Sequence, residues 1–434
     1  MNRLFYFILF YFFLTSCSLN EDSKLWKKKN IQKNENTKLI LVKEKEFTKE
    51  FNSQIKLDLS KIKIKIKNKN KIFDNQNNFG SLEYSGLLNK AGFYKFSKFK
   101  EISHLDYEPL FLKGGLIFFD NSGTIIRYDN DQKIIWKKNY YSKFEKKMNP
   151  KLTFRHNDNE LIIVDNLAKL YSININNGNL IWSNSNDYPF NSEIKIHKNK
   201  FFAVDYKNII RCFNIKDGSE CWSLQTENSL TVSGSKYSII INNEQVIFNN
   251  SVGDITAIDI NSGLINWQLP TQNTNITNET FNFKTSKLVS DGRSIYFSNN
   301  RDEIYSINIE NGSINWKNKV NSNLKPILIE NLIFTISEDG FLFTLDKKQG
   351  NIIRVNDIYK SYKSKNRKKI KPTGFIIGRN LLYLSNNDGK LFVVELTSGN
   401  ILKEERISRD SISKPFIHDK KLFVVKNGSI IKYN

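Results

Sequence analysis

The chain is poor in the residues on which metal, redox and nucleotide sites depend. Its 434 residues include only three cysteines, Cys17, Cys212 and Cys221, and four histidines that are far apart in sequence. So few cysteines exclude a disulfide framework and a zinc ribbon. The motifs HExxH, CxxC and GxxxxGKS/T are also missing, which excludes the common zinc, dithiol and phosphate-binding patterns. The sequence therefore predicts no catalytic residue, no metal ligand and no cofactor.

Proline and arginine are scarce as well, whereas lysine is abundant. Seven prolines and 20 glycines exclude a collagen-like or linker-type chain. The net charge is +22, but only 11 of the 66 basic residues are arginines, and nucleic-acid surfaces draw heavily on arginine for bidentate contacts. We interpret the excess of lysine first as a solvated surface. Attraction to an anionic membrane or to an acidic partner is the alternative, and nucleic acid is not an expected partner.

One apolar run stands out, and it lies at the N-terminus. Residues 4–14 follow Arg3 and are uniformly apolar; a run of about eleven residues is too short to cross a bilayer and fits a secretory signal. The sequence Leu-Thr-Ser-Cys at 14–17 resembles a bacterial lipobox, although an ordinary signal peptide with an incidental cysteine is the alternative. We therefore expect a lipoprotein signal peptide at 1–16 and a lipidated Cys17. Two or more acyl chains on Cys17 would anchor the protein stably.

The residues after Cys17 indicate where the anchor would hold the protein. Ser18 stands where an aspartate would resemble the signal for retention in the inner membrane. The resemblance thus favours the outer membrane, with the protein facing the periplasm. Residues 17–37 are polar and charged, so we expect a flexible tether.

A repeat with a period in the forties runs through most of the chain. Its clearest copy, Ala-Ile-Asp-Ile-Asn-Ser-Gly-Leu-Ile-Asn-Trp at 257–267, recurs at 172–182, 212–222 and 306–316. Each unit reads as four short strands separated by polar turns, without a helical period, which predicts an all-β fold. Four antiparallel strands repeated every 40–50 residues indicate a β-propeller. Strand pairs beginning near residues 116, 161, 201, 246, 294, 332, 381 and 422 predict eight blades.

The last unit ends after its third strand, which would leave an exposed sheet edge. We expect a strand within 93–102 to fill this place and close the ring. The predicted domains are thus an N-terminal strand-containing extension at 38–92 and an eight-bladed propeller at 93–434.

The tryptophan at the end of each repeat is predicted to pack flat against the neighbouring blade. Arg354 and Lys403 replace it in two later copies, which indicates looser contacts there or an edge that a partner uses. The five tryptophans to which we assign this docking role are Trp136, Trp182, Trp222, Trp267 and Trp316.

The pattern at 257–267 resembles the tryptophan-docking motif of quinoprotein-type, PQQ-like propellers. With the lipobox, the length and the strand before the propeller, the chain is similar to the BamB family, lipoproteins of the outer-membrane β-barrel assembly (BAM) machinery. The resemblance implies a non-enzymatic scaffold that binds the POTRA domains of a BamA-like insertase beside other BAM lipoproteins, and assists unfolded outer-membrane proteins. A PQQ-dependent dehydrogenase is a poorer match, since those enzymes typically carry adjacent cysteines and a calcium site. A surface adhesin or polysaccharide-binding propeller is a third alternative.

Four features remain open at the level of sequence. Cys212 and Cys221 are either separate thiols or a disulfide across a turn, which the periplasm would allow. The alternating residues 61–67 are either a solvated edge strand or a basic strip near lipid.

Residues 73–80 resemble the segment that precedes the ring in the BamB family. Residues 363–371 (KSKNRKKIK) predict a basic loop, the best candidate for an electrostatic contact.

Overall fold

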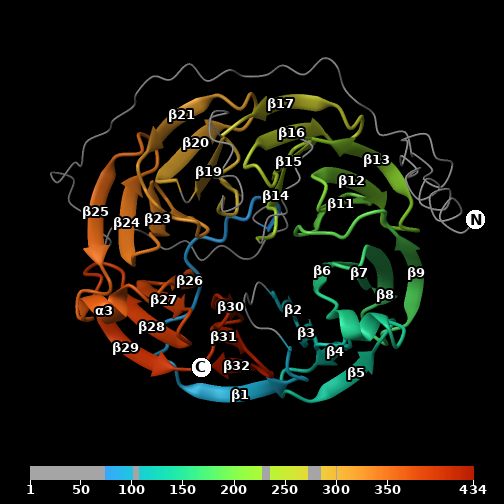
Figure 1. Ribbon diagram of the computed structural model, residues 1–434, viewed down its shortest axis with the longest axis horizontal. Helices are drawn as coiled ribbons and strands as arrows, with labels where there is room; N and C mark the ends of the chain where they lie inside the picture. The colour runs from blue at the N-terminus through green and yellow to red at the C-terminus, as the bar shows by residue number, and fades with distance from the viewer. Residues whose placement is uncertain (1–73, 101–106, 227–234, 272–284, 300) are drawn as a thin grey trace, which may run out of the picture. The chain divides into compact units, whose positions relative to one another are not determined.

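The computed structural model describes residues 74–434 apart from 101–106, 227–234, 272–284 and 300. All of these lie in the second of two units of the chain, Asn34–Asn434, and only this unit is described. Its strands form eight four-stranded antiparallel sheets that follow one another around a ring (Figure 1). The predicted eight-bladed β-propeller is confirmed. No helix within the described ranges has the length and apolar character needed to cross a membrane.

Seven blades use four consecutive strands each, numbered from the channel outward. The first four blades are β2–β5 (Leu110–Leu112, Gly115–Phe119, Ile125–Tyr128, Ile134–Lys138), β6–β9 (Leu152–Asn157, Glu160–Asp165, Lys169–Asn174, Leu180–Ser185), β10–β13 (Lys195–His197, Lys200–Val204, Ile209–Asn214, Glu220–Gln225) and β14–β17 (Ile239–Asn242, Gln245–Asn249, Ile255–Asp259, Ile265–Leu269). The next three are β18–β21 (Val289–Ser290, Ser294–Asn299, Glu303–Asn308, Ile314–Asn318), β22–β25 (Ile327–Ile329, Leu332–Ile336, Phe341–Asp346, Ile352–Asp357) and β26–β29 (Pro372–Gly378, Leu381–Asn386, Lys390–Glu395, Ile401–Arg406).

The eighth blade combines the two ends of the described chain. It consists of β30 (Phe416–His418), β31 (Lys421–Lys426), β32 (Ser429–Tyr433) and β1 (Lys90–Lys95), with β1 antiparallel to β32. The strand thus begins three residues before the expected stretch and ends before Phe96. Closure of the whole ring by this strand stays a prediction.

Burial explains why the second and third strands are continuous apolar runs. Every residue of β27 is buried and five of the six in β7 are, whereas β9 on the outside has none that is fully buried. The middle strands of a blade are covered on both faces by the neighbouring blades, so they need no polar face. The core is therefore a set of apolar layers between blades.

The turn between the third and fourth strands has the same construction in most blades. In the fourth blade the Asp259 carboxylate accepts hydrogen bonds from the backbone N–H groups of Asn261 (3.0 Å) and Ser262 (2.8 Å). Gly263 follows with a φ of 73°, a left-handed conformation that favours glycine. The aspartate or asparagine at this position therefore stabilises the turn.

Each repeat tryptophan reaches the turn of the next blade. The indole N–H of Trp267 donates to the backbone oxygen of Ile309 (3.1 Å), and its ring lies against Gly312. A Cβ on Gly312 would come within 2.5 Å of the ring, so glycine is required there for space as well as for its positive φ. The indole N–H groups of Trp136, Trp182, Trp222 and Trp316 donate in the same way, to Ile175, Ile215, Ile260 and Lys347.

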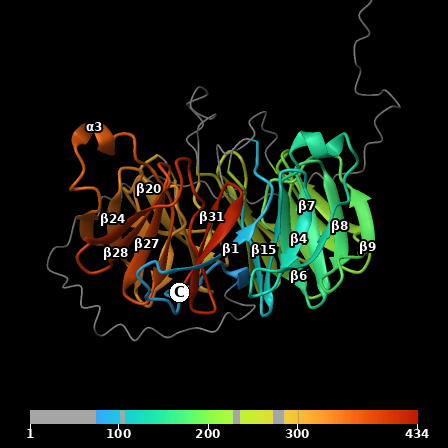
Figure 2. The ribbon, with the colours of Figure 1, turned by 90° about the horizontal axis from the view of Figure 1, so that it is seen from below.

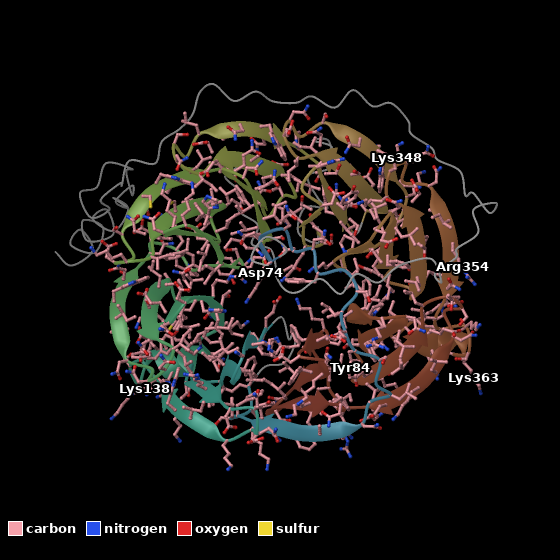
Figure 3. The ribbon with its side chains drawn as sticks, turned by 180° about the vertical axis from the view of Figure 1, so that it is seen from behind. Asp74, Tyr84, Lys138, Lys348, Arg354 and Lys363 are labelled. Carbon is pink, nitrogen blue, oxygen red and sulfur yellow. The ribbon has the colours of Figure 1, made fainter. Side chains whose placement is uncertain are left out.

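The segment before β1 crosses the ring from its centre to its rim. In Figure 3, Asp74 lies near the centre and Tyr84 closer to the edge. The backbone oxygen of Gln76 accepts a hydrogen bond from Ser290 N (2.9 Å), and Leu82 bridges to Gly378. This segment therefore contacts blades that are far from it in sequence.

Candidate functional site: the central channel and the connection face

The ring surrounds a channel with a volume of about 1360 Å³. Its wall is built from the first strands of the blades and from the residues just before them, and part of the segment at 74–82 lines it as well. Because first strands are short and end in turns, charged side chains of different blades can converge here. A hollow of this size with convergent charged groups is a natural candidate site.

Glu108 connects three blades across this channel. Its carboxylate lies 2.5 Å from Lys287 Nζ, before β18, and 2.6 Å from Lys414 Nζ, before β30. The channel wall removes part of the hydration of the Glu108 carboxylate, which opposes its ionisation, but Lys287 and Lys414 outweigh this effect and hold the pKa of the carboxyl well below its usual range. The first, fifth and eighth blades are therefore linked by one charged group.

Asn77 forms the second centre of contacts. Its side-chain NH₂ donates to Glu193 (3.0 Å) and to the backbone oxygen of Leu288 (3.1 Å), while its oxygen accepts from Lys195 Nζ (2.7 Å). Asp74 forms an ion pair with Arg155. These bonds fasten the N-terminal segment to blades two, three and five.

The charged groups around Asn77 have shifted pKa values. Burial opposes the charged form of Glu193, but Lys195 and Lys287 lower its pKa to about 2. Burial lowers the pKa of Lys195 to about 8, against the opposing attraction of Glu193. Within the described ranges, no three side chains of His, Cys, Asp or Glu are grouped so that they could hold a metal ion.

The second candidate surface is the face on which the loops between consecutive blades lie, here called the connection face. The basic loop, residues 363–371, lies in the link from β25 to β26 and contains the helix α3 (Ser364–Arg367). Figure 2 shows α3 projecting from one side of the ring. Arg367 pairs with Asp357 (2.7 Å) and Lys371 with Asp339 (3.3 Å).

All five lysines of the basic loop are exposed, and four of them are not within ion-pair distance of a described carboxylate. These four are Lys363, Lys365, Lys368 and Lys369. The loop therefore presents uncompensated positive charge to a partner on the connection face.

The structure places the predicted tryptophans between blades and outside the channel. Trp267 and Trp316 are 2% and 1% exposed and Trp136 is also buried, whereas Trp182 and Trp222 are half-buried. Cys17, the residue predicted to carry lipid, lies outside the described residues, as do the signal peptide, the tether and residues 61–67.

The two cysteines of blade three are free thiols in the structure, with Cys212 buried and Cys221 exposed. A register shift after Cys212 sets Trp222 opposite it, so the two cysteines are not direct cross-strand partners and the disulfide is not formed. The Cys212 side chain lowers the pKa of the Cys221 thiol, which donates to the side-chain oxygen of Asn214 (3.5 Å). The structure shows the reduced pair, and an oxidised pair stays a prediction.

The charged groups of the channel were missed by the sequence reasoning. They come from six blades and the N-terminal segment, and no short motif joins them. One signal could have found several: a serine followed by a charged residue before the first strand. Ser192–Glu193, Ser286–Lys287 and Ser413–Lys414 follow this pattern, and the hydroxyl of each serine donates to the backbone oxygen of the charged residue.

Similar propellers are known from solved structures. BamB from Moraxella catarrhalis is 14% identical, with a TM-score of 0.66 over 80% of this chain and 100% of that one. Quinohemoprotein alcohol dehydrogenase from Comamonas testosteroni is 9% identical, with a TM-score of 0.61 over 81% of this chain and 78% of that one. The C-terminal WD40 domain of Sif2 is 13% identical, with a TM-score of 0.58 over 80% of this chain and 99% of that one. At these identities the similarity establishes the fold alone.

Sequence comparison is more specific. No curated protein sequence matches the chain. A family model described as "Outer membrane protein assembly factor BamB" matches residues 121–356, from the first blade to the sixth. Because this match spans more than half of the chain, the protein belongs to the BamB family.

Proposed function

We propose that the protein is a non-enzymatic scaffold lipoprotein of the BAM complex, anchored through Cys17 to the periplasmic face of the outer membrane. It binds the POTRA domains of a BamA-like insertase, beside other BAM lipoproteins, and assists the insertion of outer-membrane proteins. The observation that carries the proposal is the family match over residues 121–356, whose description names outer-membrane protein assembly.

The connection face offers the best surface for an acidic partner. The basic loop follows the last strand of a blade with a packed core. This blade holds the exposed lysines in a defined position. Long-range attraction between such a patch and an acidic domain speeds association and orients the two proteins.

The outer edges of the blades offer a second means of binding. Among the described strands, the fourth strand of each blade pairs on one edge only, and in β5 and β9 this strand also carries exposed apolar side chains. Ile134 and Leu180 are 52% and 48% exposed. An extended segment of a partner can add to such an edge through backbone hydrogen bonds, which suits the delivery of unfolded β-rich chains.

Purification of the membrane-bound protein with its partners tests the proposal. We expect a barrel insertase to co-purify, and a photo-crosslinking side chain at Lys365 to capture it. Lys348, in the turn between β24 and β25 on the opposite face, is the matched control and should capture none. Purification without any insertase would contradict the proposal and would favour the adhesin alternative.

The similarity to a quinohemoprotein dehydrogenase favours one alternative function, a periplasmic PQQ-dependent dehydrogenase. The residues of the channel do not fit a quinone cofactor of this type. The cysteines lie in β12 and β13, and neither lines the channel, while the N-terminal segment and its ion pairs take up part of the centre. Reduction of a dye after addition of PQQ and calcium would reverse our choice.

A further inference from the structure

Positive charge exceeds negative charge around the middle of the channel. The described residues that line the channel include eight lysine and arginine side chains and six carboxylates. Five of these cations and three of these carboxylates form the cluster around Asn77 and Glu108. The cations are Arg155, Lys195, Lys287, Lys325 and Lys414, and the carboxylates are those of Asp74, Glu108 and Glu193.

The three carboxylates are already engaged. Asp74 pairs with Arg155, and Glu108 is shared by Lys287 and Lys414. Glu193 lies 3.8 Å from Lys195 and is hydrogen-bonded to Asn77. No carboxylate of the cluster is left to neutralise a fifth cation.

Lys325, just before β22, is that fifth cation. Its ammonium lies over the ring of Phe79 at 4.6 Å from the centroid, and no described oxygen accepts a hydrogen bond from it. A cation–π contact contributes about 0.5–2 kcal/mol and leaves the charge of Lys325 unbalanced. Burial, then the nearby charges of Lys414 and Lys287, lower the pKa of Lys325 well below its usual value.

We propose that the channel binds a small oxyanion with two or more negative charges, a compact polycarboxylate or phosphate, between Lys325 and the neighbouring Lys287 and Lys414. The cavity is large enough for such a ligand. The ligand would supply the acceptors that Lys325 lacks, through charge-assisted hydrogen bonds, which are stronger than neutral ones. Phe79 forms a flat apolar wall beside it. The site is independent of partner binding on the connection face.

Titration calorimetry with citrate and pyrophosphate as probes, on the full-length protein at low ionic strength, tests this site. We expect both probes to bind and to take up a proton, because the anion favours the charged form of Lys325. The proton uptake is measured by repeating the titration in buffers of different ionisation enthalpy. Absence of binding of either probe at millimolar concentration would overturn the proposal.

Three variants locate the site. Lys325→Met should weaken binding by about tenfold or more, the loss expected for one charge-assisted contact, whereas Lys348→Met on the outer turn should change nothing. Glu108→Gln frees Lys287 and Lys414 from their carboxylate and should tighten binding several-fold. A fold defect cannot produce this gain. Equal affinity of the wild type and Lys325→Met, or weaker binding by Glu108→Gln, would contradict the assignment, whether or not the insertase co-purifies.

Discussion

The blade interfaces that contain a tryptophan differ from those that do not. In each of the first five blades, the fourth strand carries a tryptophan whose indole lies on a glycine in a turn of the next blade. In the sixth blade Arg354 replaces the tryptophan, whereas the side-chain NH₂ of Asn356 still donates to the backbone oxygen of Ser398 (2.7 Å), as Asn318 donates to Gly350 in the fifth blade. The apolar contact of the indole is therefore lost in the sixth blade, whereas the polar contact of the asparagine is kept.

The seventh and eighth blades are joined in a third way. The eighth blade has no turn between a third and a fourth strand, because its fourth strand is β1, so a tryptophan at Lys403 would have no glycine to cover. Lys403 instead donates to the backbone oxygen of Leu87 (2.6 Å), and Tyr84 packs against Tyr383 with ring centroids 5.0 Å apart. The N-terminal segment thus supplies the contacts where the repeat cannot.

The largest expected effect comes from breaking the N-terminal contacts. Tyr84→Ala combined with Tyr94→Ala removes two buried rings from different apolar clusters, and each truncation costs about 3–5 kcal/mol. The sum approaches the whole stability of a typical domain, so we expect the protein to unfold at ambient temperature in calorimetry or circular dichroism. Tyr188→Ala, at a half-exposed ring, is the control. Survival of a native thermal transition would show that β1 does not close the ring.

Removing one tryptophan tests the other kind of interface. Trp267→Ala should lower the free energy of unfolding by about 3–5 kcal/mol, since a buried indole and its hydrogen bond are lost. Chemical denaturation measures the change. A cost below about 1 kcal/mol would mean that the indole contributes little between the blades.

The charged centre should make stability depend on pH. The pKa of Glu193 is lowered from 4.5 to about 2, so its contribution is full above pH 4.5 and is lost as the pH falls toward 2. At neutral pH, Glu193→Gln should cost roughly 3 kcal/mol. The difference between the wild type and the variant, followed by denaturation at several pH values, should shrink in acid. A difference that does not depend on pH would refute this account.

The smallest effect should be a gain. Arg354 lies opposite Thr344 in β24, as Trp316 lies opposite Ser306 in β20. Gly399 in the next turn has a φ of 69°, and the Asn356 side chain takes the place that an indole covers in the first five blades. Arg354→Trp should therefore stabilise the protein by about 1 kcal/mol, measured as a higher denaturation midpoint. Lys403→Trp is the control and should give no gain, because the next blade lacks the turn.

Much of the propeller could be predicted from the sequence, because the residues that form each strand and turn are close together in the chain. The apolar second strands start at or within one residue of the expected positions, and glycine and aspartate mark the turns. The docking of Trp267 on the next blade follows from repetition, since each unit must cover its neighbour. Such features recur every 40–50 residues and can be found by comparing the chain with itself.

The channel could not be predicted, because its contacts do not repeat. Glu108 meets a lysine 179 positions away and another 306 positions away, and side chains that converge from different blades leave no pattern along the chain. The path of residues 74–88 was missed for the same reason: this segment belongs to no repeat. Its anchor, Asn77, is one asparagine among many in an asparagine-rich sequence.

The pairing of β1 with β32 has a consequence for how the protein is made. The hydroxyl of Tyr84 donates to the backbone oxygen of Asn434, 350 positions later. Tyr84 therefore cannot form this contact until Asn434 has been synthesised. Contacts of such long range slow folding. Until β32 has been synthesised, β1 has no pairing strand and is open to mispairing.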